Sequence, residues 1–198
     1  MKLIHYLPGQ TMTEMIVVLF IISVGLYGAV TLIFSNLVLQ ENDADMIKAM
    51  NLAREMLEIV QNKRDSNWLA SKSFSDGMLN ISGCVAVPNW NATDYPSFSS
   101  VPNIDDPLAV VKNSTDPASL GMLTNQTGTN TEFSRIISFY AICADPANLS
   151  STFVQGTCSC SVSPYTKVIG LRAKADVKWK RKSKTKTLTV YTDIYDWR

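Results

Sequence analysis

Residues 15–39 read MIVVLFIISVGLYGAVTLIFSNLVL, an apolar stretch without a proline or a charged side chain. A helix needs about 20 apolar residues to cross the hydrocarbon core of a bilayer, so this stretch can span a membrane. Lys2 and His5 precede it, and three acidic residues follow it between positions 41 and 45. Because basic flanks stay cytoplasmic, we expect a single-pass protein with its N-terminus in the cytoplasm and the rest outside.

The helical pattern continues beyond the apolar stretch. Apolar residues recur there at steps of three and four and share one face: Met46, Ala49, Met50, Ala53, Leu57 and Val60. The opposite face is polar: Lys48, Asn51, Glu55, Glu58 and Asn62. No glycine or proline interrupts residues 29–64. The sequence therefore predicts one helix from about residue 11 to Arg64, ~80 Å long at ~1.5 Å per residue.

Alternating segments near the C-terminus predict an antiparallel hairpin. One carries apolar residues at every second position: Ile169, Leu171, Ala173, Ala175, Val177 and Trp179. After a polar turn around residues 182–184, the alternation resumes with Leu188, Val190, Thr192 and Ile194. A period of two means that one face is buried and the other is wet. The buried face is the natural partner of the apolar helix stripe.

The middle of the chain is less regular. Phe133–Cys143 alternates and predicts another strand. Residues 71–131 are rich in Asn, Ser, Thr, Asp, Pro and Gly and predict loops, with a short strand at Cys84–Val87. The expected fold class is α+β: a long N-terminal helix, half of it transmembrane, packed on an antiparallel β-sheet.

One acidic residue stands at the start of the apolar stretch. The run Pro8-Gly9-Gln10-Thr11-Met12-Thr13-Glu14-Met15 contains Glu14, the only charged residue between Lys2 and Glu41. A carboxylate at the edge of an apolar helix is costly unless it finds a partner, so Glu14 is a functional candidate. The alternative is a glutamate solvated among the lipid headgroups.

This run resembles the processing site of type IV prepilins. The resemblance implies that prepilin peptidase, a membrane-embedded aspartyl peptidase, cuts between Gly9 and Gln10. It further implies methylation of the new N-terminus at Gln10. Phenylalanine is usual where Gln10 stands, and an N-terminal glutamine can also cyclise, so both modifications stay open. In this family the glutamate at the place of Glu14 pairs with the free terminal amine of a neighbouring subunit and fixes their register.

Residues 53–69 and 177–197 resemble the helix end and the terminal hairpin of minor pilins and pseudopilins. The resemblance implies a leader peptide at residues 1–9, a transmembrane and filament-core segment at 10–40, and an extracytoplasmic pilin-like domain at 41–198. The precursor would lie in membrane lipid and meet an inner-membrane assembly platform. It would then join other pilin subunits in a cell-surface type IV pilus or a type II secretion pseudopilus. The unusual Gln10 favours a minor over a major subunit.

Other fates of the N-terminus remain open. A membrane-anchored extracytoplasmic binding protein would keep Met1. A secreted protein would be cut before about Ala29, but the bulky Leu26 and Tyr27 stand where signal peptidase prefers small residues. A glutamate inside a signal peptide would also be unusual.

The inventory of reactive residues argues against an enzyme. His5 is the only histidine, which excludes Ser-His-Asp and Cys-His catalysis from the rest of the chain. Imidazole is also the commonest ligand of catalytic zinc. We therefore expect no catalytic residue, no cofactor and no bound metal.

The four cysteines are Cys84, Cys143, Cys158 and Cys160, and all would lie outside the cell, where disulfides persist. Cys158 and Cys160 are too close to bond comfortably with each other, so we expect each to pair with Cys84 or Cys143, in either combination. A four-thiolate metal site and free thiols are weaker alternatives, because no C-x-x-C pair is present.

Two charged clusters have weaker functional interpretations. Residues 178–186 are rich in Lys and could contact DNA, but Trp179 falls on the buried face, and lysines at a hairpin commonly protect an exposed edge. A solvated hairpin is therefore favoured. Asp105, Asp106 and Asp116 could bind calcium, although their spacing fits no known ligand pattern.

Overall fold

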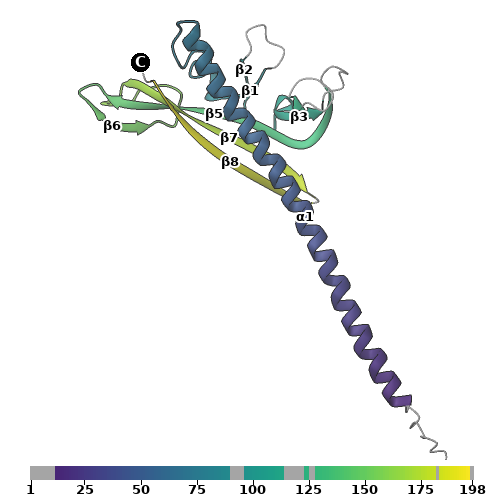
Figure 1. The fold of residues 1–198 in the computed structure, drawn as a ribbon. Helices are drawn as coiled ribbons and strands as arrows, with labels where there is room; N and C mark the ends of the chain where they lie inside the picture. Colours follow the sequence, from purple (N-terminus) through teal and green to yellow (C-terminus); the bar gives the residue numbers. More distant parts are fainter. Residues whose placement is uncertain (1–11, 90–95, 114–122, 125–127, 182, 197–198) are drawn as a thin grey trace, which may run out of the picture. The chain divides into compact units, whose positions relative to one another are not determined.

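The computed structural model describes residues 12–89, 96–113, 123–124, 128–181 and 183–196. Figure 1 shows a long helix and a sheet of antiparallel strands. The elements in chain order are α1 (Met12–Leu69), η1 (Ser82–Cys84), β1 (Val85–Pro88), β2 (Phe98–Ser100), η2 (Pro107–Ala109), β3 (Val110–Asn113), β4 (Leu123–Thr124), β5 (Thr129–Asp145), β6 (Asn148–Val154), β7 (Lys167–Arg181) and β8 (Lys184–Tyr195). The chain divides into two structural units, residues 1–45 and residues 46–198, and we refer to the second as the head.

The helix α1 is continuous, as the sequence predicts, but it ends at Leu69 rather than at Arg64. Its last turn is held by Asn67, whose buried amide donates hydrogen bonds to the carbonyl oxygens of Phe74, at 3.3 Å, and Asp76, at 2.8 Å. Asn67 thereby ties the end of α1 to the segment that turns back along it. The helix continues past the predicted end at Arg64 because the Asn67 amide binds carbonyl oxygens several residues further along the chain.

The strand β5 is the centre of the sheet. One of its edges pairs along nearly its whole length with β7, from Phe133 opposite Trp179 to Ala144 opposite Lys167. Its other edge pairs in turn with three shorter strands, β3, β1 and β6. The predicted hairpin is confirmed, because β7 pairs with β8 from Gly170 to Arg181 without a break.

The head half of α1, residues 46–69, packs on one face of this sheet. The shared core contains Ala49, Leu52, Ala53, Met56, Leu57 and Val60 from α1, and it contains Ile137, Phe139, Leu171, Ala173, Ala175 and Val177 from β5 and β7. A smaller cluster, which includes Val87, Val101 and Ile136, covers the opposite face of β5. The α+β arrangement of a helix on an antiparallel sheet is therefore present, and β5 is buried on both faces.

Two details of the predicted helix faces are wrong. Met46 was expected in the buried stripe but is 43% exposed, and the stripe instead includes Leu52 and Met56. Glu55 was expected on the free face but receives two hydrogen bonds from Arg135 of β5, at 2.6 and 3.3 Å. The guanidinium of Arg135 is fully buried, so the acidic partner has to come from the packed side of the helix.

The loop-rich region also contains more strand than its composition predicts. β2, β3 and β4 are two to four residues long and lie within residues 71–131. The predicted strand at Cys84–Val87 is found one residue later, as β1. β6 was not predicted. These short strands are held by pairing to β5 or to each other, so no periodicity of their own reveals them.

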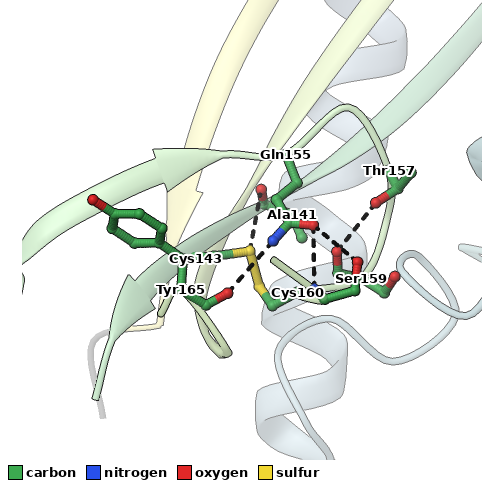
Figure 2. The surroundings of a disulfide bond; sticks show 8 residues. Ala141, Cys143, Gln155, Thr157, Ser159, Cys160 and Tyr165 are labelled. Atoms are coloured by element: carbon green, nitrogen blue, oxygen red, sulfur yellow. Dashed lines mark hydrogen bonds between the residues drawn. A yellow bond between two sulfur atoms is a disulfide. The ribbon is translucent and has the colours of Figure 1, made fainter. Parts of the chain in front are cut away.

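The head contains two disulfides. One joins Cys84 to Cys158 across 74 residues, and the other joins Cys143 to Cys160 across 17 residues. The structure thus selects one of the two combinations that the sequence leaves open. Figure 2 shows the second disulfide between β5 and the segment that follows β6, where the side chain of Gln155 accepts a hydrogen bond from the Ser161 backbone at 3.2 Å.

Candidate functional site

The apolar half of α1, residues 12–40, has no partner within the described chain that buries it. Each residue from Met12 to Gln40 is exposed, including large side chains such as Phe20, at 68%, and Phe34, at 65%. A contiguous apolar surface of this extent marks a site of contact with a membrane or another protein. By length and hydropathy, α1 is also the one helix among the described residues that could cross a bilayer.

Three hydroxyl groups inside the apolar half form hydrogen bonds within the helix. The hydroxyls of Ser23, Thr31 and Ser35 donate to the carbonyl oxygens of the residues four positions earlier, at 2.7, 2.8 and 3.0 Å. An unpaired hydroxyl is costly in hydrocarbon, whereas water would satisfy it without help from the backbone. This arrangement suits a helix surrounded by lipid or by other apolar helices.

Glu14 lies in the first turn of α1, where the positive end of the helix dipole stabilises a carboxylate. Its side chain is exposed, and no hydrogen-bond or ion-pair partner is found for it among the described residues. The predicted cleavage and modification positions, Gly9 and Gln10, lie outside the described residues. Glu14 is therefore an exposed acid at the start of the apolar half of α1.

The Lys-rich residues 178–186 lie on the hairpin of β7 and β8, which is part of the head. Trp179 is 3% exposed and stacks on Phe133 with ring centroids 6.0 Å apart, which confirms its predicted place on the buried face. Asp105 forms an ion pair with Lys178, and Asp106 accepts a hydrogen bond from the Leu108 backbone at 2.8 Å. Asp116, the third residue of the possible calcium site, lies outside the described residues.

The outer face of the hairpin carries ordered ion pairs. Arg172 of β7 donates two hydrogen bonds to the carboxylate of Asp193 on β8, at 2.7 and 2.8 Å. These hydrogen bonds hold the pKa of Asp193 below its usual range. The pKa of Lys174 is raised by its hydrogen bond to Asp176. Opposite charges that face each other across paired strands stabilise the hairpin modestly.

A cavity of about 550 Å³ lies at the other end of the head, beside both disulfides. Its walls include Phe74, Asp76, Cys158, Val168 and Asp196. Among the described residues, no cluster of His, Cys, Asp and Glu has the geometry of a metal site. The cavity brings together the segment that follows α1, the disulfide-bonded segment around residues 158–160, the start of β7 and the residue after β8.

One residue that matters to the head was missed by the sequence reasoning. Arg135 interrupts the apolar strand Phe133–Cys143, and a lone Arg in a strand otherwise suited to burial could have indicated a buried ion pair. The helical acid that meets it, Glu55, could not be identified without the packing of α1. Comparisons of the chain with family models, with curated proteins and with solved structures find no match.

Proposed function

We propose that this protein is a structural subunit of the type IV pilin kind, which is held in a membrane as a precursor and assembled into a filament through the apolar half of α1. The observation that carries the proposal is that every residue from 12 to 40 is exposed, with one carboxylate at the start of this segment. The motif around Gly9 and Gln10 adds the resemblance to prepilins.

The two halves of α1 suit such a subunit. The head half is committed to its own sheet, so it cannot also serve as a binding helix. The apolar half is stable in lipid and equally in a bundle of similar helices, because both surround it with apolar contacts. Transfer between these environments costs little, whereas transfer to water would expose the whole stretch.

Glu14 supplies the specificity that apolar contacts lack. A bundle of apolar helices has many axial registers of similar energy, and a carboxylate without a partner in an apolar surrounding penalises most of them. In the proposed filament, the terminal amine of a neighbouring subunit, freed by cleavage after Gly9, is its partner. We infer a minor pilin or pseudopilin, and the choice between pilus and secretion pseudopilus follows from the filament in which it is found.

The first test is the N-terminus of the natural protein. Mass spectrometry of the membrane and filament fractions is expected to find a chain that begins at Gln10, methylated or cyclised. A Gly9→Val variant is expected to keep Met1 and to stay in the membrane. A natural protein that retains Met1 would instead be an anchored extracytoplasmic protein, and one that begins near Ala29 would be secreted.

The second test separates processing from assembly. Glu14→Gln keeps the shape of the side chain and removes its charge, so cleavage should continue while incorporation into filaments falls about tenfold or more, the value of one charge-assisted hydrogen bond. Glu58→Gln is the matched control, because Glu58 is exposed on the head half of the same helix. Normal incorporation of the Glu14→Gln variant would refute the register role.

A further inference from the structure

The disulfide between Cys84 and Cys158 borders the cavity of the head with one of its two residues. Cys158 is among the residues that line the cavity, whereas Cys84 is not. Both cysteines are partly exposed. A thiol that enters the cavity therefore meets Cys158 first, and attack on the Cys158 sulfur would expel Cys84.

The surroundings of the two sulfur atoms also favour Cys84 as the leaving group. The backbone N–H of Cys158 donates a hydrogen bond to the Sγ of Cys84 at 3.1 Å, and such a donor stabilises a thiolate more than a disulfide sulfur. The Sγ of Cys158 instead lies 3.8 Å from the carbonyl oxygen of Ile81, whose partial negative charge disfavours a thiolate there. Exchange is faster when the expelled thiolate is the more stable one, so both contacts favour attack on Cys158.

The backbone at Cys84 gives an independent reason for this bond to open. Cys84 has a φ of 60°, in the left-handed region where a residue with a Cβ is strained. Strained backbone of this kind is concentrated at functional sites. Once the bond to Cys158 is broken, Cys84 is free to leave this conformation, and the release of strain favours the opened form.

The second disulfide borders the same cavity but differs in the sulfur that would be expelled. Cys160 lines the cavity, so attack there would expel Cys143. Cys143 has no exposed surface, and its Sγ lies 3.8 Å from the carbonyl oxygen of Ala141 (Figure 2). A thiolate expelled into a buried place beside a carbonyl oxygen is costly, because it loses its hydration and meets a partial charge of the same sign. The two disulfides therefore share one cavity and should react differently.

We propose that the Cys84–Cys158 disulfide is a thiol-exchange site, which a dithiol opens through the cavity while Cys143–Cys160 stays closed. A thiolate of the dithiol attacks the Cys158 sulfur and forms a mixed disulfide, and the bond to Cys84 breaks with Cys84 leaving as a thiolate. The second thiol of the dithiol then displaces Cys158. The dithiol is thereby oxidised to a disulfide, its two electrons reduce the cystine, and its two protons end on Cys84 and Cys158.

Exchange at this site would change the head without unfolding it. The bond from Cys84 to Cys158 links the segment before β1 to the segment after β6. When it opens, Cys160 keeps the segment after β6 attached to β5 through Cys143, and β1 stays paired with β5. Two walls of the cavity would thus lose one covalent link while the sheet stays intact. The proposal depends on the geometry of the head alone and not on the proposed function.

The test follows both disulfides of the full chain in detergent during exposure to dithiothreitol. At each time point N-ethylmaleimide blocks the free thiols, and tandem mass spectrometry measures the blocked fraction of Cys84 and of Cys143, which report one disulfide each. We expect Cys84 to become reactive at least about tenfold faster, the value of one hydrogen bond to a developing charge. Concentrated urea is the matched control, because an unfolded chain loses both environments and should open the two bonds at similar rates.

A monothiol identifies the sulfur that is attacked. Brief treatment with cysteamine should leave an adduct on Cys158 and a blocked thiol at Cys84, and an adduct mainly on Cys84 would contradict the direction of attack. Equal rates for the two disulfides in the folded chain, or a preference that persists unchanged in urea, would overturn the proposal. So would a Cys84 that reacts only as the near-ultraviolet circular dichroism of the head is lost, because the bond would then open by unfolding.

Discussion

The two halves of α1 share one backbone and differ in what surrounds them. In the head half, Ala49, Ala53 and Met56 have no exposed surface, and Glu55 meets a buried arginine. In the apolar half, every side chain from Met12 to Gln40 is exposed. In proteins, most of the stability of a helix comes from tertiary packing, because isolated helices are only marginally stable in water. The head half obtains this packing from its own chain, and the apolar half must obtain it from outside the chain.

The largest effect should come from truncating a buried side chain in the head half. Met56→Ala removes a fully buried side chain and should lower the free energy of unfolding of the head by about 3–4 kcal/mol. Phe20→Ala, the matched change in the apolar half, should change it by less than about 0.5 kcal/mol. Urea unfolding of the full chain in detergent measures both. Similar losses for the two variants would show that the halves are not independent.

The apolar half should respond to charge instead. Leu26→Asp places a carboxylate near the middle of the apolar stretch and should make membrane insertion less favourable by about 3 kcal/mol. Leu26→Ala controls for the loss of the leucine side chain. Insertion is measured as the fraction of chain that resists alkaline extraction of membranes. An unchanged inserted fraction for Leu26→Asp would argue against a lipid surrounding for this half.

A further prediction concerns the ion pair between Glu55 of the head half and Arg135. Glu55→Ala leaves the buried Arg135 guanidinium without this carboxylate and should cost about 2 kcal/mol, less than for a deeply buried pair because the Glu55 side chain is 33% exposed. Glu58→Ala, one turn further along and exposed, should stay within about 0.5 kcal/mol of wild type. Chemical denaturation of both variants measures the difference, and equal costs would show that the pair contributes nothing.

The smallest expected effect is a pH dependence confined to the head. Hydrogen bonds from Arg172 lower the pKa of Asp193 in the folded state, so the pair stabilises the head above the ordinary aspartate pKa of about 3.9. This contribution is lost as the pH falls through the lower, folded-state pKa. Both side chains are about one-third exposed, 38% and 30%, so it should amount to about 0.5 kcal/mol. Arg172→Met should remove it, and the two unfolding curves, which differ at neutral pH, should converge in acid.

Much of the fold could be predicted from the sequence because strong periodicity marks it. The helix over the apolar stretch and the hairpin of β7 and β8 are predicted from single segments, and both are confirmed. The prepilin motif belongs to this class of local signal as well, but Gly9 and Gln10 lie outside the described residues, so cleavage remains a prediction.

The remainder depends on contacts between segments far apart in the chain. The partner of Arg135 is 80 residues away, and the first disulfide spans 74 residues. Strands as short as β4 are too short to show a periodicity in the sequence. They form because a longer neighbouring strand pairs with them through backbone hydrogen bonds. The sheet surface on which α1 packs likewise decides which of its residues are buried, and it leaves Met46 exposed.

The pairing of the four cysteines has a consequence for the biogenesis of the protein. Both cystines link β-strand or loop segments that come together only in the folded head, and such bonds persist only in an oxidising compartment. In the proposed topology, a chain whose translocation stalls would therefore carry four reactive thiols, and a translocated one would carry none. Alkylation of intact cells with a membrane-permeant maleimide would count the stalled molecules directly, and the redox state of the head would thereby test the proposed topology.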